Sequence, residues 1–92
     1  MGQPVFMPHT YILYSEKLNK YYIGSCVDLA IRLRQHNSGH SKFTRPGVPC
    51  IVVYSEEYAM LLDARKRELQ IKRMKSRKYI EDLIENGRAS RS

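Results

Sequence analysis

The sequence predicts an α/β (α+β) fold in which a small three-stranded antiparallel sheet is flanked by helices, in the order ββαβαα. Two runs that are rich in aromatic and β-branched residues, 10–15 and 20–25, stand on either side of a short polar stretch, as in a β-hairpin. A third run of this kind, 50–55, lies between segments with helical spacing. The alternation of strand-like runs with segments of helical spacing predicts strands and helices that share one core.

The chain length is sufficient for one domain. Because 92 residues that are 42% hydrophobic can enclose a single core, we expect that domain to span residues 10–86. Residues 1–9, which contain two prolines and no periodic pattern, and residues 87–92 are predicted to be flexible termini.

The first two strands form the predicted hairpin, with residues 16–19 as its polar turn. Because side chains alternate across a strand, Tyr11 shares one face with Leu13, and Tyr22 shares one face with Gly24. Gly24 is predicted to have a structural role, since a missing side chain lets another group approach the backbone closely.

The first helix is predicted to begin after Asp28, a typical N-cap, and to end at the Asn, Ser and Gly of 37–39. At about 100° per residue, Arg32 and His36 are neighbours on one arc beside the leucines that face the core. Two interpretations stay open for this pair. The polar ends either converge on a cleft, or they extend into solvent from the edge of the core stripe.

Residues 37–50 contain glycines, prolines and basic side chains, and are predicted to form a loop. His40, Lys42 and Arg45 suit phosphate contact, and Phe43 suits base stacking. The run 50–55 that follows is predicted to be the third strand, either central or at an edge of the sheet.

The longest helical pattern covers residues 57–76, with Glu68 inside its apolar arc. A buried carboxylate needs a partner, because burying an unpaired charge is costly. Glu68 can pair along the helix with Arg65 or Lys72, or it can bind a metal ion, and both interpretations stay open. The apolar positions expected to face the core are Met60, Leu61, Leu62, Ala64, Leu69 and Ile71.

A last helix is predicted to begin after Ser76, which suits an N-cap, and to stop at Gly87. Its expected buried face consists of Tyr79, Ile80, Leu83 and Ile84.

The charge balance favours a polyanionic partner. Lys and Arg number 16 against 9 Asp and Glu, giving a net charge of +7, so nucleic acid is the leading candidate, and the alternative is that the charge only promotes solubility. No segment has the apolar length of a membrane span or the pattern of a signal peptide, so we expect a cytoplasmic protein. Cys26 and Cys50 stand alone and are interpreted as packing residues.

Four segments together resemble the GIY-YIG nuclease superfamily: TYILYS from Thr10, YYIGS from Tyr21, RLRQHNSG from Arg32, and KRELQIKRMKSRK from Lys66. The resemblance covers residues 10–84 and is closest to the short, single-domain bacterial members, which are similar to the nuclease module of the excision-repair enzyme. The first motif departs from the family pattern, because His9 and Thr10 stand where Gly and Ile would be.

The resemblance implies a divalent-metal-dependent DNA endonuclease that acts in DNA repair, recombination or processing, with one Mg²⁺ or Mn²⁺ ion as cofactor. It implies that Glu68 binds this ion, that Arg32 stabilises the phosphate charge, and that Tyr11 is the general base. Tyr22 would orient the water or share the role of base, and His36 would relay a proton or hold the phosphate. A late asparagine of the family has Asn86 as its only candidate here. The implied catalytic residues are Tyr11, Tyr22, Arg32, His36 and Glu68.

A domain of this size is expected to contact mostly phosphates, which predicts salt-dependent DNA binding with structure-selective or weakly sequence-selective cleavage. A partner subunit that supplies specificity, and the oligomeric state, stay open. Two other classes of protein are alternatives: a nucleic-acid-binding module whose catalysis has lapsed, and a zinc-binding adaptor, for which the ligand spacing is poor. The adaptor would use Cys26, Cys50, His36 and His40. The predicted DNA contacts are Lys42, Arg45, Lys72, Arg73, Lys75 and Arg77.

Overall fold

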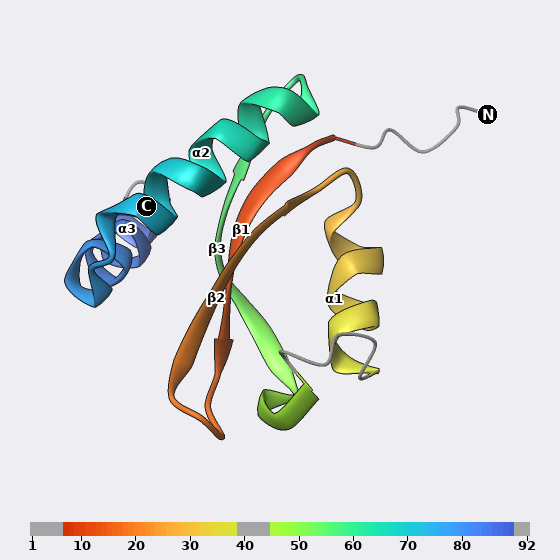
Figure 1. Ribbon diagram of the computed structural model, residues 1–92, viewed down its shortest axis with the longest axis vertical. Helices are drawn as coiled ribbons and strands as arrows, with labels where there is room; N and C mark the ends of the chain where they lie inside the picture. Colours follow the sequence, from red (N-terminus) through yellow and green to blue (C-terminus); the bar gives the residue numbers. More distant parts are fainter. Residues whose placement is uncertain (1–6, 39–44, 90–92) are drawn as a thin grey trace.

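A computed structural model describes residues 7–38 and 45–89, and it shows a three-stranded antiparallel sheet with helices on both faces (Figure 1). The strand order is β2-β1-β3, so β1 is central and β3 lies at an edge. The predicted fold class and the order ββαβαα are confirmed. The strands are β1 (His9–Ser15), β2 (Lys20–Cys26) and β3 (Cys50–Glu57).

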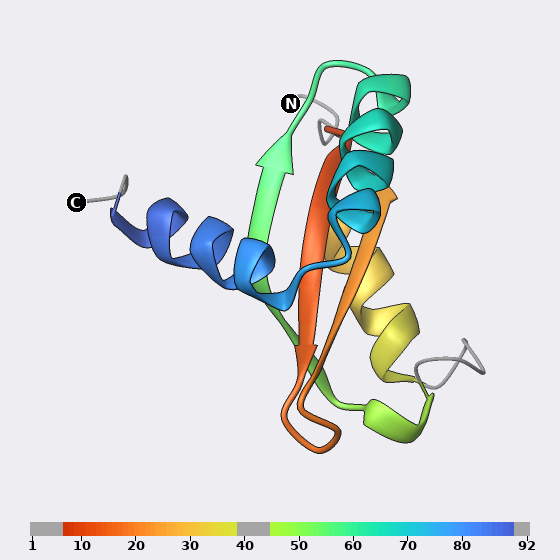
Figure 2. The same ribbon diagram turned by 60° about the vertical axis from the view of Figure 1, so that its left-hand side comes forward.

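The helices divide between the two faces of the sheet. Helix α1 (Leu29–Asn37) packs on one face, and α2 (Leu61–Met74) and α3 (Arg77–Ala89) pack on the other (Figure 2). A short 3-10 helix, Arg45–Gly47, precedes β3. No helix within the described residues is both long enough and apolar enough to span a bilayer.

The central strand β1 supplies both cores, because its side chains alternate between the faces. Tyr11 and Leu13 join the cluster beneath α1, whereas Ile12 joins the cluster beneath α2 and α3. Thr10, which is fully buried, donates a hydrogen bond from Oγ1 to the carbonyl of Ala64 at 2.6 Å. This bond attaches α2 to the middle of the sheet.

The hairpin and the helix caps follow local signals. Asn19 adopts a left-handed conformation with φ 51° in the turn between β1 and β2, a conformation that asparagine tolerates well. The Asp28 side chain accepts a hydrogen bond from the amide of Ile31 at 3.1 Å, which confirms the predicted N-cap of α1. The Ser76 hydroxyl likewise accepts from the amide of Tyr79 at 3.1 Å, at the start of α3.

The predicted apolar face of α2 is partly wrong. Ala64 and Ile71 are buried, but Met60, Leu62 and Leu69 are 61%, 59% and 51% exposed. At about 100° per residue, Leu62 and Leu69 point roughly 140–160° away from Ala64, which faces the sheet. Met60 precedes the first turn as the N-cap residue. The sequence therefore contains more apolar residues in this segment than the sheet covers.

Gly87 does not end α3, because the helix continues to Ala89. A Cβ atom at Gly87 would lie 3.1 Å from the ring of Tyr54 on β3. The glycine thus allows the helix to approach this ring closely, and packing prevails over the local stop signal.

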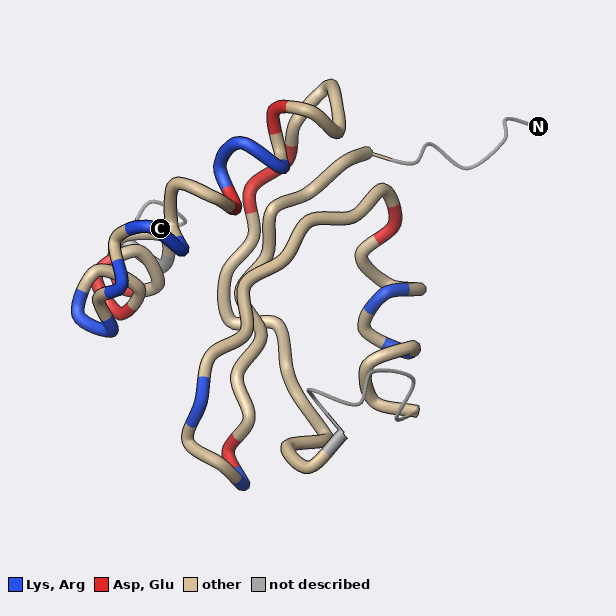
Figure 3. Tube along the Cα trace, in the orientation of Figure 1, with Lys and Arg blue, Asp and Glu red and all other residues tan. Residues whose placement is uncertain are grey.

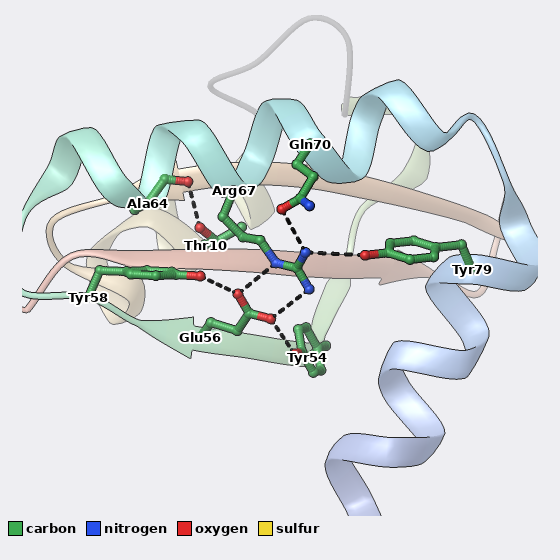
Figure 4. A network of polar contacts seen from close by, with 8 residues as sticks. All are labelled: Thr10, Tyr54, Glu56, Tyr58, Ala64, Arg67, Gln70 and Tyr79. Atoms are coloured by element: carbon green, nitrogen blue, oxygen red, sulfur yellow. Dashed lines mark hydrogen bonds and ion pairs between the residues drawn. The ribbon is translucent and has the colours of Figure 1, made fainter.

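A polar network joins β3 to α2 and α3 (Figure 4). Arg67 donates two bonds to Glu56, from Nε to Oε1 at 2.9 Å and from Nη2 to Oε2 at 3.1 Å. The hydroxyls of Tyr54 and Tyr58 donate to the same carboxylate, and Arg67 also donates to the hydroxyl of Tyr79 at 3.2 Å. Planar, charge-assisted pairs of this kind are among the stronger polar interactions in proteins.

The network shifts the proton affinities of its members. Although burial alone would raise the pKa of the Glu56 carboxyl, hydrogen bonds from Arg67, Tyr54 and Tyr58 hold it below its ordinary value. Burial, together with the adjacent Glu56 carboxylate, raises the pKa of Tyr54 and of Tyr58 to about 12. Glu56 therefore stays ionised in the folded protein at neutral pH.

We expect Glu56→Gln to lower the free energy of unfolding by about 1–3 kcal/mol, because Arg67 loses its ionised acceptor in a half-buried site. Chemical denaturation measures this change. Since the pKa of Glu56 is depressed in the folded state, the loss should be complete above the ordinary value of 4.5 and should shrink as the pH falls through the folded-state pKa.

The matched control is Glu81→Gln, because Glu81 pairs with Arg77 at 3.2 Å but both side chains are about half exposed. This change should alter the free energy of unfolding by less than about 0.5 kcal/mol. Equal losses in the two variants would contradict a special role for the network.

Candidate active site

The site is centred on Tyr11, whose ring lies over Gly24 of the neighbouring strand. The two residues are paired in the register of β1 and β2. A Cβ atom built at Gly24 would lie 2.6 Å from Cζ of Tyr11 and closer still to the hydroxyl oxygen. Since Tyr11 is only 3% exposed, its ring has little room to move aside. Glycine at this position is therefore what allows the tyrosine to occupy its place.

Helix α1 brings His36 and Arg32 to the hydroxyl end of Tyr11. The Nε2 atom of His36 lies 3.5 Å from the Tyr11 hydroxyl oxygen, and the two rings meet edge to face. Arg32, one turn earlier on the same helix, lies close enough for its guanidinium to lower the pKa of Tyr11. The structure thus brings together three of the predicted catalytic residues.

The electrostatics of this group favour a protonated tyrosine and a neutral histidine. Burial raises the pKa of Tyr11 above 10.0, and the charge of Glu68 adds to the increase, while the hydrogen bond and charge of Arg32 oppose it. Burial, followed by the positive charge of Arg32, lowers the pKa of His36 below 6.5. His36 can therefore accept a proton at neutral pH.

Glu68 approaches from α2, on the other face of the sheet, and its side chain is 19% exposed. Its Oε1 accepts a hydrogen bond from the Ser25 hydroxyl at 2.5 Å, and its Oε2 accepts one from Nζ of Lys72 at 2.7 Å. The intrahelical pair considered from the sequence is thus formed with Lys72. The charge of Glu68 also raises the pKa of Tyr11, so the two faces of the sheet interact electrostatically at this edge.

The donor set at Glu68 fits a hard cation such as Mg²⁺. The carboxylate offers oxygen ligands, and Mg²⁺ in proteins is commonly bound by one or two carboxylates together with water and substrate phosphate. Within residues 7–38 and 45–89, no group of three or more His, Cys, Asp or Glu side chains is arranged to hold a metal ion. Glu68 is the carboxylate that the sequence resemblance assigns to such an ion.

Tyr22 contributes a buried hydroxyl to the same face as Tyr11. Its ring packs against the cluster that includes Tyr11 and Leu13, and Nζ of Lys20 lies 5.6 Å from the ring centroid. In the described part of the chain, the Tyr22 hydroxyl is the one buried side-chain polar atom without a hydrogen-bond partner. An orphaned polar atom of this kind is suited to a water or substrate oxygen.

The basic residues predicted to contact DNA lie in different environments. Figure 3 shows Lys and Arg on α1, α2, α3 and the hairpin between β1 and β2. Lys72 is paired with Glu68. Arg77 donates to the backbone and side chain of Asn19 and lies 4.9 Å from the ring centroid of Tyr21, so it holds α3 against the hairpin.

The other predicted DNA contacts lie at the end of α2, at the start of the short 3-10 helix, or outside the described residues. Arg73 is exposed at the end of α2, and Lys75 caps that helix with a left-handed φ of 48°. Arg45 begins the short 3-10 helix, and Lys42, with His40 and Phe43 of the same loop, lies outside the described residues. The late asparagine candidate, Asn86, is exposed on α3, beside the contact with Tyr54 at the β3 edge.

Two residues that support the site were not identified as site residues from the sequence. Ser25 follows Gly24, and the alternation of the strand directs it toward α2 and Glu68. Asn37 looked like a helix stop, but its side chain pairs with both backbone groups of Cys50, at 2.6 and 3.0 Å. This pairing fixes the end of α1, and with it His36, against β3.

The two cysteines are part of the core beneath α1. Cys26 and Cys50 are free thiols, and they are buried in the cluster that contains Tyr11 and Leu13. Burial raises the pKa of both thiols, which disfavours the thiolate that metal binding requires. Their role in the described structure is packing.

Comparison with known proteins identifies the family that this chain resembles. Residues 7–80 match the family model described as "GIY-YIG catalytic domain". A UPF0213 protein of Streptococcus pneumoniae serotype 4 is 39% identical over 67 residues, covering 72% of this chain and 68% of that protein. A UPF0213 protein of Staphylococcus haemolyticus is 33% identical over 70 residues, covering 72% and 85%. No solved structure matches the chain significantly.

We expect Gly24→Ala to destabilise the protein by about 1–3 kcal/mol, because the added Cβ overlaps the buried ring of Tyr11. A double-mutant cycle with Tyr11→Leu, followed by chemical denaturation, measures the coupling. In the Tyr11→Leu background the cost of Gly24→Ala should fall, since the overlapping ring atoms are gone. An equal cost in both backgrounds would contradict the close approach.

Proposed function

The chain belongs to the GIY-YIG catalytic domain family, and we propose that it is a divalent-metal-dependent DNA endonuclease that hydrolyses phosphodiester bonds. The resemblance seen in the sequence motifs is confirmed, and the family's catalytic domain implies nuclease activity with DNA as substrate. The observation that carries the proposal is the arrangement of the Tyr11 hydroxyl 3.5 Å from a neutral imidazole and beside a guanidinium.

The pKa shifts of Tyr11 and His36 support different roles for these two residues in proton transfer. Because the pKa of Tyr11 is raised, the tyrosine acts as a base only when its own proton has a destination. In the proposed reaction, the attacking water gives a proton to the Tyr11 oxygen while the Tyr11 proton passes to Nε2 of His36. The hydroxyl of Tyr22, which is buried and has no hydrogen-bond partner among the described residues, orients the water.

Arg32, and Glu68 through the bound ion, stabilise the negative charge of the phosphate. The planar guanidinium of Arg32 donates hydrogen bonds to phosphate oxygens as negative charge develops on them. Glu68 holds the ion, and a bound Mg²⁺ or Mn²⁺ supplies Lewis-acid stabilisation of the same charge. Ser25 keeps the Glu68 carboxylate oriented toward the β2 edge.

The proposed domain spans residues 10–86 and binds DNA mostly through phosphates, with structure-selective or weakly sequence-selective cleavage in repair, recombination or processing. Exposed basic side chains and the net charge of +7 support this mode of binding. We propose a cytoplasmic location and leave room for a partner subunit that adds specificity. The proposed phosphate contacts are Lys42, Arg45, Lys72, Arg73, Lys75 and Arg77.

The proposal is tested with a labelled panel of duplex, single-stranded, flapped and branched DNA, in Mg²⁺, Mn²⁺ or EDTA. We expect metal-dependent cleavage that falls at least about 100-fold in Arg32→Ala and in Glu68→Gln, because each removes stabilisation of the transition-state charge.

The matched control for this test is Arg34→Ala, since Arg34 is exposed on the same helix and carries the same charge. Its cleavage rate should stay within a few-fold of the parent rate. DNA binding without cleavage by the parent protein would instead favour a module whose catalysis has lapsed.

The pH dependence of cleavage tests the role of His36. Because His36 must be neutral to accept a proton, kcat/KM should rise with pH through the His36 pKa, which lies below 6.5. Titration of the His36 ring by NMR measures the same pKa. In Arg32→Gln this NMR value should increase, since an adjacent positive charge is removed. A kcat/KM profile that does not follow the His36 pKa measured by NMR would exclude this assignment.

A further inference from the structure

The two oxygens of Glu68 are held by groups of different character. Ser25 donates to Oε1 at 2.5 Å from strand β2, and Lys72 donates to Oε2 at 2.7 Å from the next turn of α2. Glu68 is 19% exposed, whereas Lys72 is 49% exposed. One partner therefore belongs to the sheet, and the other belongs to the solvent side of the helix.

We propose that Ser25 positions the Glu68 carboxylate and that the Lys72 ammonium is a stand-in cation, which a divalent ion must displace from Oε2. This inference rests on the proposed function, in which Glu68 is the metal ligand. It adds two residues to the metal site: a positioning residue at Ser25 and a competing cation at Lys72.

The two interactions should respond differently when an ion arrives. The Ser25 side chain has one rotatable bond to its oxygen and is attached to a strand that is hydrogen bonded to β1, so it stays in place. Lys72 is long and half exposed, and exposed i,i+4 ion pairs contribute little to stability. A divalent cation has twice the charge of the ammonium and gains more from Oε2.

A second lysine pair in this chain shows the ordinary form of the motif. Lys78 and Asp82 are also spaced i,i+4, but their atoms are 3.5 Å apart and their side chains are 85% and 58% exposed. Asp82 thus remains well hydrated, whereas Glu68 is mostly covered and has a hydroxyl donor from another element. Lys78 is therefore a matched control for the charge, length and helical spacing of Lys72.

The test measures Mn²⁺ affinity of the full chain without DNA, by electron paramagnetic resonance of free Mn²⁺. Lys72→Met should bind Mn²⁺ about 3- to 10-fold more tightly, because a competing and repelling cation is removed. Lys72→Arg, which keeps the charge, should bind like the parent. Ser25→Ala should bind about 10-fold more weakly, as is common when a partner that orients a ligand is lost.

The controls separate this inference from the proposed function. Lys78→Met should leave Mn²⁺ affinity unchanged, and Glu68→Gln should remove the site; circular dichroism confirms that each variant is folded. Glu68-dependent binding that is unchanged in Lys72→Met, or equally strengthened in Lys78→Met, would overturn the inference and leave the metal role of Glu68 intact. Binding that does not depend on Glu68 would overturn both.

Discussion

The rotation of α2 about its own axis is the constraint on which the site depends. Ala64 accepts the Thr10 hydrogen bond from β1, and Arg67 forms its paired bonds with Glu56 on β3. Glu68, the next residue, then faces β2 and meets Ser25. Since successive helical residues differ by about 100°, a small rotation of α2 would break all three attachments. The Glu56 network therefore fixes the position of Glu68 without touching it.

The edge strand β2 joins the two faces of the sheet at adjacent residues. Gly24 faces α1 and leaves space for the Tyr11 ring, whereas Ser25 faces α2 and binds Glu68. The period of two in a strand produces this division directly. The charge of Glu68 accordingly makes a minor contribution to the raised pKa of Tyr11, which is caused mainly by burial.

Local signals made most of the fold predictable, whereas contacts between distant elements were not. The Asp28 cap and the hairpin depend on neighbouring residues, so the sequence was sufficient to predict them. The Gly87 stop was overridden by packing on Tyr54, and the network of Glu56 has no local pattern because its partners come from other elements. The site residues were suggested by family resemblance, and Lys72 was one of the two intrahelical partners considered for Glu68. Its other partner, Ser25, could not be predicted because it lies on a different element.

The placement of opposite charges around Tyr11 has a chemical consequence. Of the described residues, Lys72 rather than Arg32 forms the ion pair of Glu68, and Arg32 instead interacts with Tyr11 and His36. If Glu68 and Arg32 neutralised each other, neither charge would remain for a cation or a phosphate. The carboxylate is held instead by a hydroxyl and an exposed ammonium, and the guanidinium has no carboxylate partner among the described residues. The negative charge of Glu68 and the positive charge of Arg32 therefore do not neutralise each other in the described structure.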